Sequence, residues 1–362
     1  MGPNPYGKRI KALREGLAEA NLDGYLVADV KNIYYLTGFL DIADATLRLI
    51  IPLDSDPVLW VLPLSHDLAD EQSRGCTVKK VERGEKVDEK VTKGIEDLKM
   101  TRVGFDTLRA TTYLTMTRAL GDLELKEAAD TIMALRRVKG REEVAYMRKA
   151  AELTDIAIKA GIEAVEPGVR EHEVAAEIEY AMRTHGSEWY AFETLVASGP
   201  RSAYPHGVST SRTIRPGDFV IMDVGAVHRG YRSDITRTVV AGKPTPRQTE
   251  VYDLVLRAQE EAFQHIRAGV AGREVDAIAR KIIMDAGYGD HFIHGLGHGV
   301  GLDVHEPPRL SSTSEDVLEE GNVLTDEPGI YIRGHGGVRI EDTVLVHKDR
   351  GERLTGTERT IL

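Results

Sequence analysis

Short apolar runs alternate with longer stretches of mixed polarity along the first 127 residues. Runs rich in Val, Ile, Leu and Tyr are typical of strands, and they occur at Tyr25–Ala28, Leu47–Pro52, Val58–Leu62 and Arg102–Phe105. Two stretches that carry apolar residues among charged ones, Leu64–Ser73 and Lys86–Met100, are predicted to be helices. This alternation predicts a small α/β domain.

The pattern changes from about Thr131 onwards. Apolar positions at helical spacing run through residues 133–165 and stop at Glu166-Pro167-Gly168, which predicts one long helix. A second helix is predicted over Glu171–Thr184, and strand-like runs with glycine-rich turns predominate after Phe192. Two more helices are predicted among these strands, at Gln248–Ile266 and Glu274–Ala286.

Helices and strands that are segregated in this way are typical of an α+β domain. A chain of 362 residues, 41% of them hydrophobic, is long enough for two domains with a core each. We therefore predict two domains, residues 1–130 and residues 131–362.

Composition and charge exclude several classes of protein. The formal net charge of −11 argues against nucleic acid as a partner. No apolar run approaches the roughly 20 residues that a membrane span requires, and the N-terminus lacks the apolar segment of a secretory signal. Cys76 is the single cysteine, which rules out an intrachain disulfide and a thiolate metal cluster. These features predict a cytoplasmic protein without membrane contact.

The first candidate for chemistry is a predicted hairpin, residues 219–240. Two apolar runs flank His228-Arg229-Gly230, and a turn centred between His228 and Arg229 places Asp223 opposite Asp234. Aspartate is depleted in strands, and two like charges that face each other repel unless a bound cation neutralises them. The alternative is that one aspartate belongs to a turn and the other is an exposed strand residue.

A second hairpin repeats this construction over residues 323–346. A turn centred on Gly334 places Glu327 opposite Glu341. Asp326 immediately precedes Glu327, and alternation along a strand predicts that its side chain points away from Glu327, toward solvent or a salt bridge. The chain therefore contains two hairpins that each carry a facing pair of carboxylates.

Residues 291–308 read HFIHGLGHGVGLDVHEPP and combine four histidines with glycine at alternate positions. We expect the glycines to leave the backbone bare, so that a peptide and metal ions approach closely.

Together, the four carboxylates of the two hairpins and one imidazole of this segment suit Mn²⁺, Co²⁺ or Zn²⁺. Carboxylates that bridge suit two ions about 3.5–4 Å apart, an arrangement used in hydrolysis. Strict alternation would place His298 and His305 on opposite faces, so a bend or bulge is expected near Asp303.

These motifs carry a family resemblance. The segments DVGAVHRGYRSD (223–234), HGLGHGVGLDVHEPP (294–308), EPGIYI (327–332) and GGVRIED (336–342) resemble the pita-bread metallopeptidases (M24). That superfamily includes methionine aminopeptidase, Xaa-Pro aminopeptidase, Xaa-Pro dipeptidase (prolidase) and creatinase. Residues 22–39, LDGYLVADVKNIYYLTGF, resemble the N-terminal domain of the proline-specific and creatinase branches. The resemblance implies an α+β, pita-bread catalytic domain preceded by a smaller α/β creatinase-like domain.

The resemblance also implies a dinuclear centre with two divalent ions, Mn²⁺ or Co²⁺, with Zn²⁺ as an alternative. Asp223 would bind one ion, His298 and Glu327 the other, and Asp234 and Glu341 would bridge the two. A water or hydroxide shared by the ions would be the nucleophile. Glu327 would act as the general base and deliver the proton to the leaving nitrogen.

Further roles follow from the same resemblance. His206 matches a histidine that stabilises the tetrahedral intermediate, His305 one that contacts the scissile carbonyl, and His294 one that holds the substrate beyond that bond. Tyr331 and Arg339 match supports around the glutamate ligands, on the substrate side of the site. Arg309 would bind the free carboxylate of a dipeptide, and the alternative is an ordinary surface arginine.

The function implied by the resemblance is hydrolysis of the Xaa-Pro bond in dipeptides by an Xaa-Pro dipeptidase. The short spacing between Glu327 and Glu341 and the presence of Arg309 favour this interpretation. The closest alternative is an Xaa-Pro aminopeptidase that acts on longer X-Pro peptides. A creatinase-like hydrolase of a small non-peptide amide and a binding module without catalysis are both disfavoured by the complete set of ligands. By analogy with relatives, we expect a homodimer.

Overall fold

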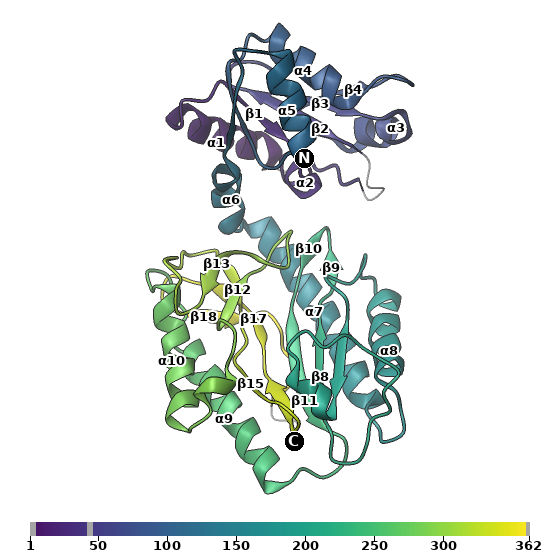
Figure 1. Ribbon diagram of the computed structural model, residues 1–362, viewed down its shortest axis with the longest axis vertical. Coiled ribbons are helices and arrows are strands. Elements are labelled where there is room, and N and C mark those ends of the chain that lie inside the picture. The colour runs from purple at the N-terminus through teal and green to yellow at the C-terminus, as the bar shows by residue number, and fades with distance from the viewer. Residues whose placement is uncertain (1–4, 42–45, 360–362) are drawn as a thin grey trace. The chain divides into compact units, whose positions relative to one another are not determined.

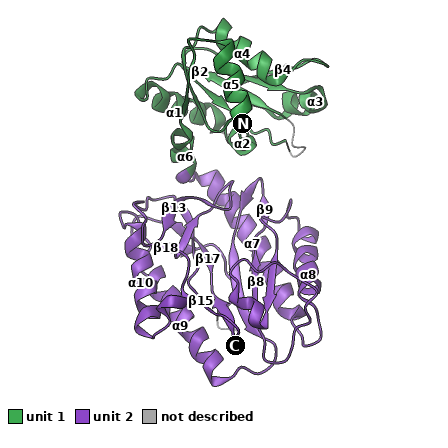
Figure 2. Cartoon of the chain, viewed as in Figure 1, with its two compact units in different colours: residues 1–136 green, residues 137–362 purple. Residues whose placement is uncertain are grey.

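The computed structural model describes residues 5–41 and 46–359. The chain divides into two compact units, residues 1–136 and residues 137–362, which Figure 2 shows in green and purple. The division falls at the end of α6 (Ala129–Arg137), near the predicted boundary at residue 130. Among the described residues, no helix combines the length and the apolar character needed to cross a membrane.

The first unit, drawn in purple and blue in Figure 1, is built on one mixed six-stranded sheet. Its strand order is β4-β3-β2-β1-β5-β6. The strands are β1 (Gly24–Val27), β2 (Arg48–Pro52), β3 (Val58–Val61), β4 (Thr77–Lys80), β5 (Arg102–Phe105) and β6 (Glu124–Glu127). Its other helices are α1 (Pro5–Glu19), α2 (Val30–Thr37), α3 (Pro63–Gln72), α4 (Val87–Asp97) and α5 (Ala110–Ala119). The predicted α/β architecture is confirmed.

Two strands of this sheet were not predicted, and their positions explain why. The strands β4 and β6 lie at the two edges of the sheet, and most of their side chains are exposed or only partly buried. Edge strands tolerate charged side chains because one side of the strand pairs with nothing. The sequences TVKK and ELKE therefore carry little of the apolar signal that identifies a strand.

The single long helix expected over residues 133–165 is wrong. The chain forms α6 and then α7 (Arg141–Ala164), with a break at Val138-Lys139-Gly140. The backbone N–H of Lys139 donates to the carbonyl of Gly321, 2.8 Å away, instead of to a helical partner. The N–H of Gly140 donates to Glu143 Oε2 at 2.9 Å, which caps the start of α7. The predicted helix α8 (Glu171–Thr184) is confirmed.

One half of the second unit is a three-stranded antiparallel sheet in the order β11-β8-β7. Its strands are β7 (Leu195–Ser198), β8 (Phe219–Val224) and β11 (Ile235–Val240). Buried apolar side chains of α7 and α8 pack with those of the sheet in one core, which includes Leu153, Ile158, Val174, Ile178, Met222 and Ile235. Two short strands, β9 (Val227–His228) and β10 (Tyr231–Arg232), form a separate hairpin tip.

The other half is a five-stranded antiparallel sheet in the order β13-β12-β14-β17-β18. Its strands are β12 (Gly297–Gly299), β13 (Glu306–Leu310), β14 (Val323–Asp326), β17 (Asp342–Val346) and β18 (Gly351–Arg353). The helices α9 (Pro246–Phe263) and α10 (Gly272–Asp285) pack on this sheet and on the hairpin of β15 (Gly329–Ile332) and β16 (Gly336–Arg339). The expected α+β architecture of this unit is confirmed (Figure 1).

The two halves of the second unit join where β11 runs beside residues 339–341. The N–H of Arg339 donates to Thr238 Oγ1 at 3.1 Å, and the N–H of Glu341 donates to the carbonyl of Thr236 at 3.1 Å. This junction brings the two carboxylate-bearing hairpins side by side.

Candidate metal centre

The register of the first hairpin differs from the expected one. Asp223 pairs with Thr236, not with Asp234, because the turn lies one residue further along than expected. Arg229 and Gly230 both have positive φ, 50° and 74°, and join the paired residues His228 and Tyr231. Two positive φ values are typical of a tight two-residue hairpin turn. Asp234 itself lies between β10 and β11.

The second hairpin has the expected register. Pairing of Gly329 with Arg339 in β15 and β16, and of Asp326 with Asp342 in β14 and β17, follows from a turn centred on Gly334. Glu327 and Glu341 occupy the breaks between these paired strands, on corresponding sides of the hairpin. The symmetric turn without a bulge is therefore confirmed here.

Asp326 does not reach solvent, which corrects the expectation for this residue. Its side chain is fully buried, and neither carboxylate oxygen has a hydrogen-bond partner among the described residues. All four residues of β14 are buried, so the protein covers both faces of this strand. Burial raises the pKa of Asp326 well above the ordinary carboxyl range.

The glycine-rich segment, residues 291–308, contains the irregularity that we expected between His298 and His305. The register between β12 and β13 shifts between His298 and Gly299, and residues 300–305 belong to no strand. The imidazole rings of His298 and His305 consequently lie with their centres 4.2 Å apart. The irregularity begins before Asp303, immediately after His298.

The packing of neighbouring strands gives the glycines of this segment a further reason. A Cβ added at Gly297 would lie 2.1 Å from the carbonyl oxygen of Thr325, and one at Gly299 would lie 2.3 Å from that of Pro307. The neighbouring strands of the protein itself therefore exclude side chains at these positions, while the approach of a peptide and metal ions stays a prediction.

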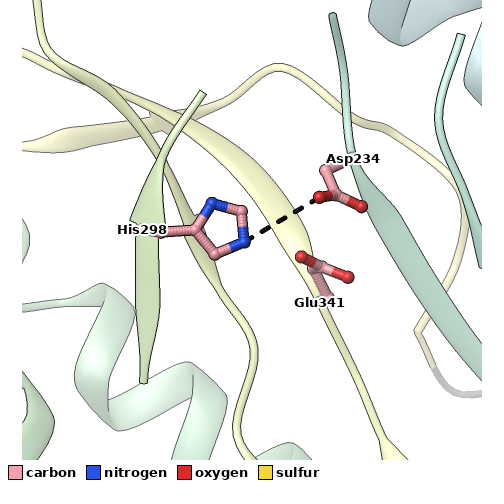
Figure 3. Close-up of side chains that lie close together, drawn as sticks. All are labelled: Asp234, His298 and Glu341. Atoms are coloured by element: carbon pink, nitrogen blue, oxygen red, sulfur yellow. Dashed lines mark ion pairs between the residues drawn. The ribbon is translucent and has the colours of Figure 1, made fainter. Parts of the chain in front are cut away.

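Three of the predicted ligands form a compact cluster, which Figure 3 shows. The cluster contains one ligand atom from each of three residues, Asp234, His298 and Glu341, and these atoms all lie within 4.8 Å of one another. His298 Nε2 is 4.0 Å from Asp234 Oδ2 and 3.1 Å from Glu327 Oε1. Asp223 joins the same group, because Arg339 bonds both Asp223 and Thr236, and Thr236 bonds Glu341. The fold thus brings together all five residues predicted as ligands.

The electrostatics of this cluster favour a bound cation. Burial raises the pKa of Asp234 and Glu341 well above the ordinary range, and neighbouring carboxylates add to the effect. Burial also raises the pKa of Asp223, against the opposing charge of Arg339. Burial alone would raise the pKa of Glu327 too, but the hydrogen bond and charge of His298 lower it to about 2.

The unsatisfied atoms of the cluster match the donor set of a divalent cation. Asp223 Oδ1 and Asp234 Oδ1 are buried and have no hydrogen-bond partner among the described residues. Buried carboxylates normally require such a partner or a metal ion. The oxygen-rich set with a single imidazole therefore fits divalent ions such as Mn²⁺ or Co²⁺.

The orientation of His298 supports the same interpretation. Its Nδ1 lies 3.1 Å from the carbonyl oxygen of Gly299, and a carbonyl only accepts hydrogen bonds, so Nδ1 carries the hydrogen. This leaves Nε2 directed at Asp234 and Glu327. Metal-binding histidines characteristically donate their other ring N–H to a backbone carbonyl or carboxylate in this way.

Arg339 is buried and contacts an aspartate ligand directly. Its Nη2 donates to Asp223 Oδ2 at 2.6 Å, and its Nε donates to Thr236 Oγ1 at 2.9 Å. Thr236 Oγ1 in turn donates to Glu341 Oε2 at 2.6 Å. Arg339 therefore supports a glutamate ligand only through Thr236, and it orients Asp223 itself.

His294 and Tyr331 form a chain of hydrogen bonds that starts at Arg339. Arg339 Nη1 donates to the Tyr331 hydroxyl at 2.9 Å, and that hydroxyl lies 2.9 Å from His294 Nε2. His294 Nδ1 faces the carbonyl of Gly295 at 2.7 Å and so carries the hydrogen, which makes Nε2 the acceptor of the tyrosine O–H. Burial lowers the pKa of His294, which favours this neutral form. Both of its ring nitrogens are engaged within the protein.

The remaining predicted residues lie at the open edge of the cluster. His206, His305 and Arg309 are exposed. Partial burial lowers the pKa of His305, and so do the charges of His298, His206 and Arg309, which places these groups around it. Arg309 pairs with His298 between the neighbouring strands β13 and β12. The imidazole and guanidinium groups of these three residues are therefore grouped together and exposed.

Sequence reasoning missed two threonines that orient ligands. Thr236 bonds Glu341, and Thr325 Oγ1 donates to Glu327 Oε1 at 2.9 Å while it accepts the N–H of His298 at 3.1 Å. Thr325 lies two residues from Glu327, and Thr236 lies two residues from Asp234. Residues two apart share a strand face, so this spacing was the available signal.

Comparison with known families agrees with the fold and the cluster. Metallopeptidase family M24 matches residues 145–348, and the creatinase/prolidase N-terminal domain matches residues 9–138. The fold and the ligand cluster thus define a metallopeptidase with a pita-bread catalytic domain and a creatinase-like N-terminal domain. The chain belongs to metallopeptidase family M24.

Several relatives are similar over nearly the whole chain. An Xaa-Pro dipeptidase of Pyrococcus horikoshii is 41% identical over 98% of this chain and 99% of its own length. The crystal structure of the prolidase from that organism matches with a TM-score of 0.92, covering 98% of this chain and 100% of the other. An X-Pro aminopeptidase from Thermotoga maritima is 32% identical, with a TM-score of 0.89, covering 98% and 99% of the two chains.

Proposed function

We propose that this protein is an Xaa-Pro dipeptidase that hydrolyses the bond before proline in dipeptides with the help of two divalent ions. The observation that carries the proposal is the cluster of five ligands with the exposed guanidinium of Arg309 on the strand next to His298. A guanidinium at that place suits the free carboxylate of a dipeptide. The full-length similarity to Xaa-Pro dipeptidases supports the same substrate class.

Asp223 would hold one ion, His298 and Glu327 the other, and Asp234 and Glu341 both. The bound ions supply a Lewis acid that polarises the carbonyl and lowers the pKa of water. We infer Mn²⁺ or Co²⁺ from the predominance of carboxylate ligands, with Zn²⁺ as the alternative.

Glu327 is the proposed general base. The bond from Thr325 holds its Oε1 in place, and a bound cation beside it would keep the carboxylate ionised. It takes the proton of the attacking water and delivers it to the proline nitrogen, which has no hydrogen of its own while it is part of the peptide bond.

The exposed imidazoles act on the substrate. The lowered pKa of His305 keeps its ring neutral, so that its N–H is available to donate to the scissile carbonyl oxygen. His206 is proposed to stabilise the tetrahedral intermediate beside it. Because both nitrogens of His294 are engaged, we propose that His294 and Tyr331 contact the substrate through their rings.

We further propose that the enzyme is a cytoplasmic homodimer. The single cysteine, Cys76, suits a reducing compartment. Leu64 and Leu68, exposed one turn apart on α3, suit a contact between subunits. Light scattering coupled to size-exclusion chromatography measures the mass, and a mass of one chain, 39.9 kDa, would contradict the dimer.

The second candidate is an Xaa-Pro aminopeptidase, which the similarity to the Thermotoga maritima enzyme favours. The test is to strip the protein with a chelator, reload it with Mn²⁺ or Co²⁺, and compare Leu-Pro with an X-Pro-Y tripeptide. Cleavage of the dipeptide alone supports the dipeptidase, and preferential cleavage of the tripeptide supports the aminopeptidase. Absence of metal-dependent cleavage of either substrate refutes both.

Arg309 provides a sharper form of this test. In a dipeptidase, Arg309→Gln loses a charged hydrogen bond, so we expect the KM for Leu-Pro to rise by about 10- to 100-fold. The matched control is Arg350→Gln, which alters an exposed arginine in the turn between β17 and β18. Equal effects of the two substitutions would contradict the role of Arg309.

A further inference from the structure

His305 has no side-chain hydrogen bond that would hold its ring. Among the hydrogen bonds of the described residues, none involves the His305 imidazole, and its ring contact is with His298. A side chain without such a bond depends on its backbone for its position. The segment Val300–His305 therefore determines where the imidazole lies, although it belongs to no strand.

A buried ion pair lies directly against this segment. Lys139 Nζ is 2.7 Å from Glu306 Oε1, and both side chains are only 1% exposed. Glu306 Oε2 also accepts the N–H of Asp303 at 3.3 Å. A Cβ added at Gly301 would lie 2.4 Å from Glu306 Oε1, so the carboxylate packs tightly against the segment backbone.

The other end of the pair is fixed by the break between α6 and α7. The N–H of Lys139 donates to the carbonyl of Gly321, and its Nζ also reaches the carbonyl of Arg137 at 3.3 Å. Arg137 Nη1 bonds Asp316 Oδ1 at 2.9 Å, while Asp316 Oδ2 accepts the N–H of Arg309 at 2.8 Å. Residues 137–139 thus hold both ends of β13, which connects His305 to Arg309.

Stability alone does not explain this pair. Removing two charges from water costs several kcal/mol per ion, and apolar residues of similar size often leave a protein equally or more stable. What an apolar pair cannot supply is the bond to Asp303 and a fixed distance between residues 139 and 306.

We propose that the Lys139–Glu306 pair positions His305 for catalysis, which makes both members positioning residues of the active site. This inference rests on the proposed function of His305 as a donor to the scissile carbonyl. Lys139, in the break between α6 and α7, would then affect the reaction rate although it is far from the metal ligands in sequence.

The first experiment does not depend on activity. The double variant Lys139→Met/Glu306→Leu replaces the buried pair, and Lys149→Met/Glu152→Leu makes the same change in an exposed pair on α7. We expect unchanged metal content, an unfolding temperature at or above that of the native protein, and amide hydrogen exchange about tenfold faster or more in residues 300–306. The control should match the native protein in that segment. Unchanged exchange there in the buried-pair variant would overturn the proposal.

Single variants keep the proposal testable if the double variant does not fold. Lys139→Arg retains the charge and should keep slow exchange in residues 300–306. Glu306→Gln weakens the pair and should show intermediate exchange. Equal exchange in Lys139→Arg, Glu306→Gln and the native protein would overturn the proposal as well.

The second experiment is a double-mutant cycle, which combines replacement of the buried pair with His305→Ala and measures turnover of Leu-Pro. Replacement of the buried pair should lower kcat by about 10- to 100-fold with little change in KM, as loss of an oriented donor does. In the His305→Ala background the same replacement should change kcat less than twofold. A full, multiplicative effect in that background would overturn the positioning role. If the native enzyme cleaves no Xaa-Pro dipeptide, the proposed function fails, while the exchange measurements still decide whether the pair orders the segment.

Discussion

Removal of the metal ions should make the stability of this protein fall as the pH rises from 6 to 8. In the unfolded chain the carboxyls of Asp234 and Glu341 have ordinary pKa values of 3.8 and 4.5, so both are ionised across this range. In the metal-free folded protein, burial raises both pKa values well above these, and each carboxylate also repels its neighbours. The folded state therefore retains protons that the unfolded state has lost.

The sign follows from proton linkage. Where the folded state binds more protons than the unfolded state, the free energy of unfolding decreases with rising pH. The raised pKa of His298, which results from its bond to Glu327 in spite of burial, acts in the same direction. Burial lowers the pKa values of His294 and His305, and these two groups act in the opposite direction near pH 6. Glu327 contributes no slope here, because its folded pKa of about 2 and its ordinary value of 4.5 both lie below pH 6.

The magnitude depends on how many protons are retained. One proton shared by Asp234 and Glu341 over two pH units corresponds to about 3 kcal/mol. For a domain of this size, that loss lowers the unfolding temperature by about 5–10 °C. Calorimetry in the presence of a chelator, at pH 6, 7 and 8, measures the shift of the second unit's transition.

Two controls isolate the cause. Saturating Mn²⁺ should reverse the trend, because metal binding requires deprotonated ligands and so strengthens with pH. The metal-free double variant Asp234→Asn/Glu341→Gln should lose the part of the slope that these two carboxyls supply, while Asp326, whose pKa burial also raises, keeps its own part. If the metal-free native protein were equally stable or more stable at pH 8 than at pH 6, the electrostatic account of the cluster would be refuted.

Three substitutions test other parts of the site. Glu327→Gln should lower kcat by about 10²–10⁴-fold while circular dichroism shows an intact fold, since it removes the general base; near-native turnover would exclude that role. Arg339→Lys should weaken Mn²⁺ binding in calorimetric titration by about 10- to 100-fold, because one amine cannot replace its several bonds; unchanged affinity would contradict the orienting role. Gly297→Ala places a Cβ 2.1 Å from the Thr325 oxygen and should cost about 1–3 kcal/mol in thermal unfolding. Gly121→Ala, which meets nothing within 4 Å, is the control and should cost little.

The two hairpins show how far a sequence pattern determines register. The glycine-rich turn around Gly334 is symmetric, and the expected facing of Glu327 and Glu341 is confirmed by the strand pairing on both sides. In the first hairpin the turn consists of Arg229 and Gly230, and an arginine with positive φ is not visible in a hydrophobic pattern. The register there was therefore predicted incorrectly, although Asp223 and Asp234 still act on each other's pKa.

The long helix was predicted incorrectly for a related reason. The local sequence through Val138-Lys139-Gly140 is compatible with a helix except for one glycine. The break exists because the N–H of Lys139 and its ammonium group find partners at Gly321 and Glu306. Such partners are not encoded in the periodicity of the helix itself.

The sequence by itself determined the chemistry of the site. Acidic residues within apolar strands and histidines within a glycine-rich segment marked the ligand types, because local context makes such residues costly without a bound cation. It also determined the two domains and their classes, because hydrophobic periodicity depends only on near neighbours along the chain.

Only the tertiary structure decided which partner each side chain has. The tyrosine bond that engages His294, the complete burial of Asp326 and the pairing of Lys139 with Glu306 all join residues that are distant in sequence or lie on different strands. Burial, pKa and hydrogen bonding at these positions depend on what packs against them in space. The same imidazoles and carboxylates therefore acquire separate tasks from their surroundings.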